Sequence, residues 1–232
     1  MNASEFYVQE YAFITKEADA YFERNAAATL VPAPTDHHVL SALRPIALPE
    51  RGVLIDVGGG TGQLAAGFLE IHPGWRATVI EPSQRAIEAG RMAFPSIEFR
   101  KGSITNPDDM ALGPADLVFV CTVFCWVERG LLSRAVSNVD LICRNSGLLV
   151  ISDFDSPFRR ANPYKHYDGL FTFKQDYAGI FPGLGTYTLL SRESISLLDH
   201  TTSDERDPYD QQWATSILRK DLTGLYYKAP LS

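Results

Sequence analysis

The chain has 232 residues, of which 45% are hydrophobic and 21% charged, a balance typical of a globular protein with a sizeable core. Its formal net charge of −7 at pH 7 disfavours nucleic-acid binding, because affinity for a phosphate backbone comes largely from Lys and Arg. The sequence shows no signal peptide and no run of roughly 20 apolar residues, and its three cysteines lack paired metal-type spacing. We therefore expect a cytoplasmic protein whose partners include neither nucleic acid nor a membrane.

The first segment with a helical pattern covers residues 4–28, where aromatic and apolar residues form a loose stripe. The stretch VPAPTDHH interrupts it, and Thr35 or Asp36 is expected to cap a short helix that reaches Leu43. From residue 52 onward, short apolar runs alternate with amphipathic segments, one of which Ser83 is expected to cap. The expected strands cover residues 52–57, 76–82, 96–102, 115–124 and 146–155, and the expected helices cover residues 61–72, 83–94 and 129–143.

This alternation predicts an α/β fold with a doubly wound, mostly parallel sheet, because strands that are apolar on both faces need helices on each side. The last third of the chain departs from the alternation. Residues 156–184 are polar and aromatic without a clear period. Residues 186–198 and 211–222 have the pattern of two strands joined by an acidic turn.

The stretch VLIDVGGGTGQL, residues 53–64, places four glycines behind an apolar run that ends in Asp56. Glycine is unfavourable inside regular elements, so the cluster makes room for a ligand or for a tight turn. A P-loop is excluded, because no Lys-Ser/Thr pair follows Gly62. A dinucleotide fingerprint stays open, since a start at Gly60 and Gly62 puts Ala65 at the third position, which that fingerprint tolerates.

An acid followed by alternate glycines, Asp56-x-Gly58-x-Gly60-x-Gly62, resembles motif I of the class I S-adenosylmethionine-dependent methyltransferases. In that family the loop lets the backbone approach the methionine half of the cofactor, and the acid orients the loop and the cofactor's ammonium group. A sulfonium cofactor carries no phosphate and needs no P-loop lysine. The resemblance implies a Rossmann-like fold with a seven-stranded sheet and an antiparallel last strand.

The resemblance also implies cofactor contacts on later strands. Glu81, followed by Pro82, ends the second strand. In the family, a carboxylate at this place accepts hydrogen bonds from both ribose hydroxyls of S-adenosylmethionine. The same carboxylate could accept hydrogen bonds from the ribose of NAD. Ser103 and Ile104 fall where the family commonly has Gly-Asp near the adenine ring, so Ser103 departs from the pattern. The remaining implied contacts are Cys121 and Thr122 beside the sulfonium, and Trp126 over the adenine or at the substrate entrance.

The methyl acceptor is expected to bind between the N-terminal helix and the insert after the fifth strand, both rich in aromatic residues. The substrate-binding residues expected there are Tyr7, Tyr11, Tyr21, Tyr164, His166 and Tyr177. His166 is the first candidate for a general base, because imidazole titrates near neutral pH. The histidines ranked below it are His37, His38 and His200.

No metal is expected, since the fourth strand ends without a carboxylate. The expected cofactor is S-adenosylmethionine, with S-adenosylhomocysteine as product, and the expected reaction is methylation of an O or N atom of a small-molecule metabolite, sugar or natural-product intermediate.

We expect one methyltransferase domain, as a monomer or homodimer, divided into a helical lid (1–48), a cofactor-binding core (49–155), a substrate-side insert (156–185) and a closing strand pair (186–232). Two alternatives remain open: an NAD(P)-binding oxidoreductase on a Rossmann fold, and a non-catalytic cofactor-binding protein.

Overall fold

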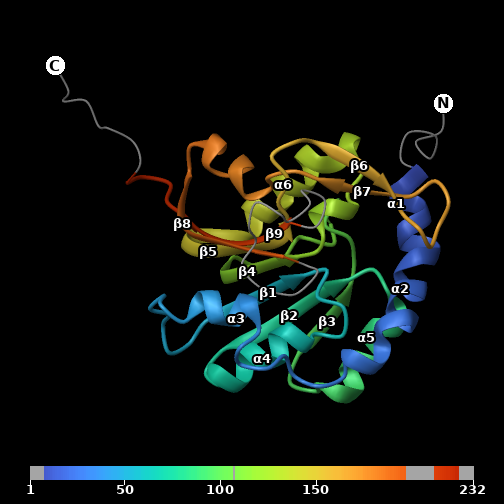
Figure 1. The fold of residues 1–232 in the computed structure, drawn as a ribbon. Helices are drawn as coiled ribbons and strands as arrows, with labels where there is room; N and C mark the ends of the chain where they lie inside the picture. The colour runs from blue at the N-terminus through green and yellow to red at the C-terminus, as the bar shows by residue number, and fades with distance from the viewer. Residues whose placement is uncertain (1–7, 107, 197–211, 225–232) are drawn as a thin grey trace.

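A seven-stranded sheet forms the centre of the computed structural model, which describes residues 8–106, 108–196 and 212–224 (Figure 1). The strands are β1 (Val53–Val57), β2 (Arg76–Glu81), β3 (Glu98–Lys101), β4 (Ala115–Cys121), β5 (Cys143–Phe154), β8 (Tyr187–Ser196) and β9 (Gln212–Lys220). Their order is β3-β2-β1-β4-β5-β9-β8. Strands β1 to β5 are parallel, and β9 is antiparallel to both β5 and β8. The fold class predicted from the sequence is confirmed.

Strand β4 illustrates why helices cover both faces of this sheet. Leu117 and Phe119 lie in the core on one face, Val118 and Val120 lie in the core on the other, and none of the four is exposed. Because successive side chains of a strand point to opposite faces, such a strand is stable only between two layers. The layers are α3 (His38–Leu43), α4 (Gln63–Ile71) and α5 (Gln84–Ala93) on the Phe119 face, and α6 (Leu132–Ile142) on the Val120 face. None of the helices in the described part of the chain has the length and hydropathy of a membrane span.

The strand order reverses direction between β1 and β4, which pair side by side in parallel. In a doubly wound sheet, the loops that leave two such strands diverge to opposite faces and open a crevice at their carboxyl ends. The glycine loop follows β1 at this edge, and Glu81 ends the neighbouring β2. The topology therefore brings motif I and Glu81 to one place.

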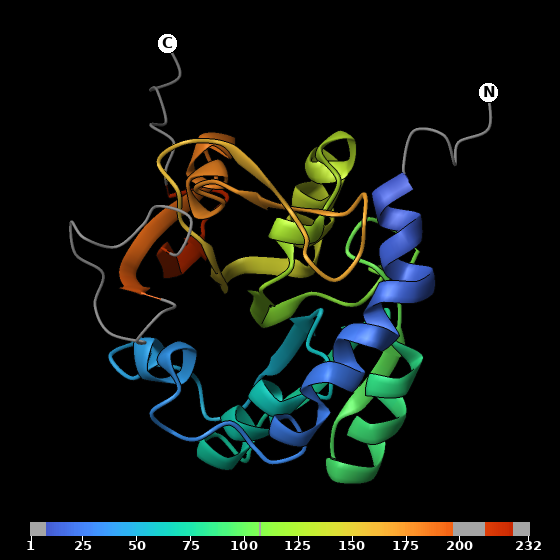
Figure 2. The same cartoon turned by 45° about the vertical axis from the view of Figure 1, so that its right-hand side comes forward.

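The N-terminal helices run along one side of the molecule, next to α5 (Figure 2). A π-helical turn at Phe13–Glu17 joins α1 (Val8–Ala12) to α2 (Ala18–Asn25), and a 3-10 turn follows at Ala26–Ala28, so the described part of the segment expected over residues 4–28 is helical throughout but is not one regular α-helix. The buried Gln9 side chain fixes α1 through its amide, which donates to Phe171 O at 2.8 Å and accepts from Phe171 N at 3.0 Å.

Helix capping follows the sequence at α5 and departs from it at α3. The Ser83 hydroxyl accepts a hydrogen bond from Ala86 N at 3.1 Å, as expected for an N-cap. At α3 the N-cap is His37, whose Nδ1 accepts from Val39 N at 3.3 Å, so the expected cap at Thr35 or Asp36 is wrong. An imidazole acceptor replaces the usual short polar side chain.

The segment after β5 contains an antiparallel hairpin, β6 (Arg160–Pro163) and β7 (Phe171–Lys174), where the sequence showed no period. Strands this short contain too few residues for an alternation to be recognised. Strand β4 ends at Cys121, because the next residue, Thr122, takes a positive φ of 59° and starts a turn. The strand expected over residues 115–124 is therefore three residues too long.

We expect Ser83→Ala to lower the free energy of unfolding by about 1–2 kcal/mol, because it removes the α5 cap. The same hydroxyl donates to Asp19 Oδ1 of α2 at 2.6 Å, so one hydrogen bond between α2 and α5 is lost as well. Urea unfolding measures the change. Ser133→Ala, at an exposed position of α6, is the matched control; equal stability of the two variants would contradict the prediction.

Candidate functional site

The glycine loop after β1 has a backbone that only glycine accommodates at Gly58. Its φ is +68°, and a Cβ there would lie 2.5 Å from Val123 Cγ2 in the turn after β4. At Gly59 a Cβ would lie 2.6 Å from the carboxyl carbon of Asp56. The glycines therefore allow the loop to fold back onto Asp56 and to pack against the β4 turn.

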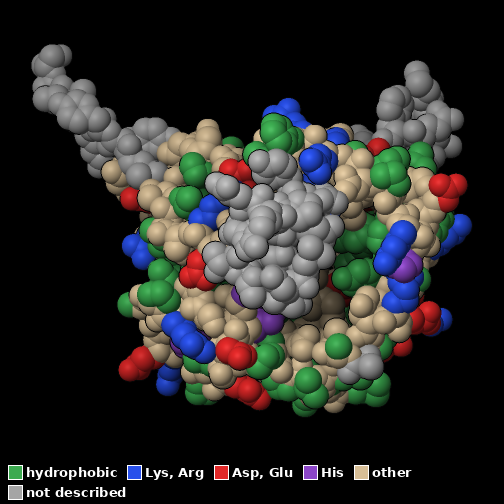
Figure 3. All heavy atoms as spheres, viewed as in Figure 1, with side chains coloured by type: hydrophobic (Ala, Val, Ile, Leu, Met, Phe, Trp, Pro, Cys, Tyr) green, Lys and Arg blue, Asp and Glu red, His purple; other side chains and the backbone are tan. Residues whose placement is uncertain are grey.

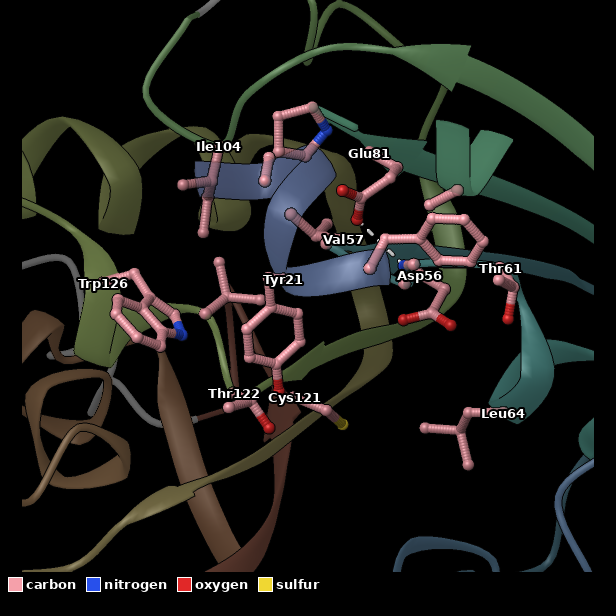
Figure 4. Close-up of a pocket in the computed structure, with 18 of the residues that line it drawn as sticks. Tyr21, Asp56, Val57, Thr61, Leu64, Glu81, Ile104, Cys121, Thr122 and Trp126 are labelled. Carbon is pink, nitrogen blue, oxygen red and sulfur yellow. Dashed lines mark hydrogen bonds between the residues drawn. The ribbon is translucent and has the colours of Figure 1, made fainter. Parts of the chain in front are cut away.

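Glu81, at the end of β2, holds the same loop from its other side. Its Oε2 accepts from Gly60 N at 2.9 Å, drawn as the dashed line in Figure 4, and its Oε1 accepts from Ser83 N at 2.9 Å. Burial raises the pKa of Glu81 to about 7, although these two hydrogen bonds oppose the shift. Each carboxylate oxygen has further lone pairs available for a ligand.

Asp56 is 1% exposed, and its Oδ2 is buried without a hydrogen-bond partner among the described residues. Burial raises the pKa of this carboxyl to about 7, and the charge of Glu81 adds to the shift. A buried oxygen without a partner costs free energy, which a ligand that donates to it recovers. An acid in this position suits a cationic group, such as the ammonium group of S-adenosylmethionine.

A cavity of about 310 Å³ opens beside the loop at the carboxyl ends of β1, β2, β4 and β5. Its wall also includes side chains from α1, α2 and the start of α3. Figure 3 shows a recess in this face of the molecule, with hydrophobic and histidine side chains at its margin. In Figure 4, Tyr21 of α2 stands between Trp126 and Asp56.

Most of the predicted cofactor residues line this cavity. They are Asp56, Gly58, Gly60, Glu81, Pro82, Ser103, Ile104, Cys121, Thr122 and Trp126. Gly62 does not line it and instead caps α4 with a φ of +80°. The Ser103 hydroxyl donates to Glu10 Oε1 of α1 at 2.8 Å. The residue that departs from the family pattern therefore contacts the N-terminal helix.

Of the predicted substrate residues, Tyr21 lines the cavity, and Tyr7 lies outside the described residues. Tyr11 is 64% exposed and does not line the cavity. Tyr177 is also absent from the lining, because it is 2% exposed and stacks on Phe124 in the core with ring centroids 5.5 Å apart.

Tyr164 and the predicted general base His166 belong to the segment between β6 and β7 and do not line the cavity. Tyr164 packs edge-on against Trp126 with ring centroids 4.7 Å apart, and its hydroxyl accepts from Arg24 at 2.9 Å. The His166 ring contacts the Tyr164 ring, with centroids 5.2 Å apart. Tyr164 therefore packs against Trp126, and His166 packs against Tyr164. Neither residue forms part of the cavity wall.

The lining residues that were missed or ranked low include His37, His38, Ser152 and Trp213. Ser152 occupies an interior position of an apolar strand, and Trp213 comes from the antiparallel β9, so neither carries a motif. The pair His37-His38 was visible in the sequence, but only the packing of α3 places it at the cavity. His200 lies outside the described residues. Within the described part of the chain, no group of three or more His, Cys, Asp or Glu side chains is placed to hold a metal ion.

Residues 55–149 match a sequence family described as a methyltransferase domain. Over this segment, which is less than half of the chain, the sequence is similar to methyltransferase domains. The match confirms the resemblance to class I S-adenosylmethionine-dependent methyltransferases that motif I predicted, and a domain of this kind implies S-adenosylmethionine as cofactor. No curated protein matches the chain by sequence.

Solved structures of methyltransferases share the fold. The 1,6-didemethyltoxoflavin-N1-methyltransferase of Burkholderia thailandensis, crystallised with 1,6-didemethyltoxoflavin and S-adenosylhomocysteine, has a TM-score of 0.62 at 14% identity over 95% of this chain and 92% of that chain. A DhpI complex with S-adenosylhomocysteine has a TM-score of 0.59 at 16% identity, covering 95% and 100%. A TehB-like S-adenosylmethionine-dependent methyltransferase from Corynebacterium glutamicum has a TM-score of 0.58 at 13% identity, covering 91% and 100%.

We expect the stability of the unliganded methyltransferase domain to fall as the pH rises to about 7. Asp56 and Glu81 have raised pKa values of about 7, so the folded chain holds protons that the unfolded chain releases above about pH 4. Their destabilising contribution is complete once the pH exceeds the folded pKa values. Asp56→Asn should make the slope of the free energy of unfolding against pH shallower and should stabilise the chain at about pH 8.

Urea unfolding at a series of pH values between about 5 and 8 measures this slope. Glu88→Gln, which removes an exposed carboxyl group of α5, is the control. A slope for Asp56→Asn equal to that of the wild type would show that the buried carboxyl pair does not cause the pH dependence.

Proposed function

We propose that this chain transfers a methyl group from S-adenosylmethionine to an O or N atom of a small molecule, such as a metabolite, a sugar or a natural-product intermediate. The observation that carries the proposal is the buried Asp56 carboxylate, whose Oδ2 has no hydrogen-bond partner among the described residues, beside the glycine loop within a segment that matches methyltransferase domains. This arrangement suits a ligand that combines an ammonium group with a ribose.

Each part of the cavity offers a surface for one part of that cofactor. Asp56 would accept from the ammonium group, and Glu81 would accept from the ribose hydroxyls while keeping its hydrogen bond from Gly60 N. Ile104 and Trp126 offer apolar surface for the adenine ring. When bound, S-adenosylmethionine supplies a methyl group that the sulfonium already activates, so the chain's main task is to hold the acceptor in line.

Two features support a small-molecule acceptor. The cavity is of a size that pockets for small ligands have, and its lining includes the aromatic side chains Phe13, Tyr21, Phe22, Trp126 and Trp213. The similar Burkholderia enzyme binds 1,6-didemethyltoxoflavin together with S-adenosylhomocysteine. The methyltransferase-domain match favours this function over a nicotinamide-dependent oxidoreductase, although Glu81 alone suits either cofactor.

S-adenosylhomocysteine should bind the purified chain, and Asp56→Asn and Glu81→Gln should each weaken that binding at least about tenfold, or about 1.4 kcal/mol. Isothermal titration calorimetry measures both effects, and Glu88→Gln is the control for removing a carboxylate. Absence of binding at millimolar ligand, or stabilisation by NAD instead in a thermal-shift comparison, would overturn the proposal. Binding without methyl transfer to any acceptor would leave the non-catalytic alternative.

Binding of S-adenosylhomocysteine should release protons at about pH 6. The pKa values of Asp56 and Glu81 are about 7 in the unliganded chain, and an ammonium group together with ribose hydroxyl donors favours the ionised carboxylates. The affinity should therefore fall as the pH drops below about 7. Calorimetry in buffers of different ionisation enthalpy counts the protons, and a pH-independent affinity would contradict the assignment.

A further inference from the structure

Helix α1 places the side chain of Glu10 against the loop that follows β3. The Ser103 hydroxyl donates to Glu10 Oε1 at 2.8 Å, and the Thr105 hydroxyl donates to the same oxygen. Glu10 and Ser103 both line the cavity, whereas Thr105 is buried outside the lining. A carboxylate from the N-terminal helix therefore joins the cavity wall at Ser103, which is 93 residues away in the chain.

The protons of this cluster are used within it. The two hydroxyl groups have one proton each, and a carboxylate has none. Three contacts share these two protons, since Ser103 Oγ also lies 2.9 Å from Thr105 Oγ1. A hydroxyl that turned its proton toward a ligand would leave two oxygen atoms in contact with no proton between them, which is unfavourable. This part of the wall therefore offers a ligand acceptors and no donors.

The acceptor that remains available is Glu10 Oε2. Both hydroxyl contacts are made by Oε1, and Oε2 accepts no hydrogen bond from the residues that the structure describes. A second carboxyl group near the loop belongs to Asp109, whose Oδ2 accepts from Ser103 N at 2.8 Å. Asp109 does not line the cavity, so of these two carboxyl groups it is Glu10 that a ligand reaches.

The position of Glu10 relative to Glu81 suits the base of the proposed cofactor. Strand β2 lies between β1 and β3, and Glu81 is opposite Lys101, two residues before Ser103. With Glu81 on the ribose and Asp56 on the ammonium group, the amino-acid half of the cofactor extends toward β1. The base is attached to the ribose and therefore extends toward the loop after β3. Adenine carries a hydrogen-bond donor, its exocyclic amino group, on the edge away from the ribose.

The backbone of α1 is also fixed at this place. Glu128 Oε2 accepts from Gln9 N at 3.2 Å, and Gln9 Nε2 donates to Trp126 O at 3.0 Å. Glu128 itself does not line the cavity. Glu10 thus has an anchored backbone in addition to two hydroxyl partners, so its carboxylate is oriented before a ligand binds.

We propose that Glu10 recognises the adenine of S-adenosylmethionine: its Oε2 accepts a hydrogen bond from the exocyclic amino group, while Oε1 keeps its hydroxyl partners. This inference rests on the function proposed above. A hydrogen bond to an ionised acceptor is roughly twice as strong as one between neutral groups. A base without the amino group leaves this carboxylate oxygen without a partner, so Glu10 makes the site selective for adenine.

Isothermal titration calorimetry with two ligands tests this inference. One is S-adenosylhomocysteine, and the other is its analogue with purine in place of adenine, which lacks only the exocyclic amino group. The wild type should bind the adenine compound at least about tenfold more tightly, and Glu10→Ala should reduce this ratio to about one. Glu10→Gln, which keeps the size of the side chain, should give an intermediate ratio, because a neutral amide is a weaker acceptor than a carboxylate.

Two further variants separate the carboxylate from the helix that carries it. Glu128→Gln weakens the hydrogen bond from Gln9 N and leaves the lining residues in place, so it should keep the wild-type ratio even if both affinities fall. Ser103→Ala should lower the ratio, because Glu10 loses one of the two hydroxyls that orient it.

A wild-type ratio of about one would overturn this inference, and so would a wild-type ratio retained in Glu10→Ala, since another acceptor would then bind the amino group. If Glu10→Ala binds neither ligand, a wild-type ratio in Glu10→Gln has the same meaning. A ratio lost in Glu128→Gln would assign the selectivity to the position of α1 and contradict the role of the carboxylate. Failure of the wild type to bind S-adenosylhomocysteine would overturn the proposed function as well, whereas the other outcomes leave that function standing.

Discussion

Asp56 places a carboxylate in the interior at the end of β1, and one of its oxygens has no partner among the described residues. Glu81 adds a second buried carboxyl group from the adjacent strand. Burial disfavours the ionisation of both acids, and the charge of Glu81 adds to this effect at Asp56, so the unliganded site carries a free-energy cost. The glycine loop between them is shaped by the same constraint, because Gly60 donates to Glu81 and Gly59 leaves room for Asp56. A cationic cofactor relieves that cost.

The N-terminal helices close this site through polar contacts with distant segments. Glu10 accepts from the hydroxyls of Ser103 and Thr105, and Gln9 pairs with the backbone of Phe171. The buried Glu17 forms an ion pair with Arg24, which also donates to Tyr164. Tyr164 of the segment between β6 and β7 contacts Trp126 and Arg24 from outside the lining, and the cavity wall itself consists of the strand ends, the loops that follow them and residues of α1, α2 and α3.

The glycine loop and the strand-end residues of the cavity were predictable because their signals are local. An apolar run followed by spaced glycines reports a buried strand and a close backbone approach, and Ser83 reports the start of α5 within a few residues. The acceptor half carried no such signal. Tyr177 and His166 were reasonable candidates by residue type, but the core encloses Tyr177, and the β6–β7 hairpin holds His166 away from the lining.

The sequence by itself determined the α/β fold, the strand that carries motif I and the methyl donor, because hydrophobic period and glycine spacing act over short stretches of chain. Tertiary structure decided which side chains outside the motifs line the cavity. His38 and Ser152 are 114 residues apart, and Ser152 and Trp213 are 61 apart, yet one hydroxyl joins all three. Such a contact depends on how α3 packs against β9 and how β9 pairs with β5, and no local pattern records it.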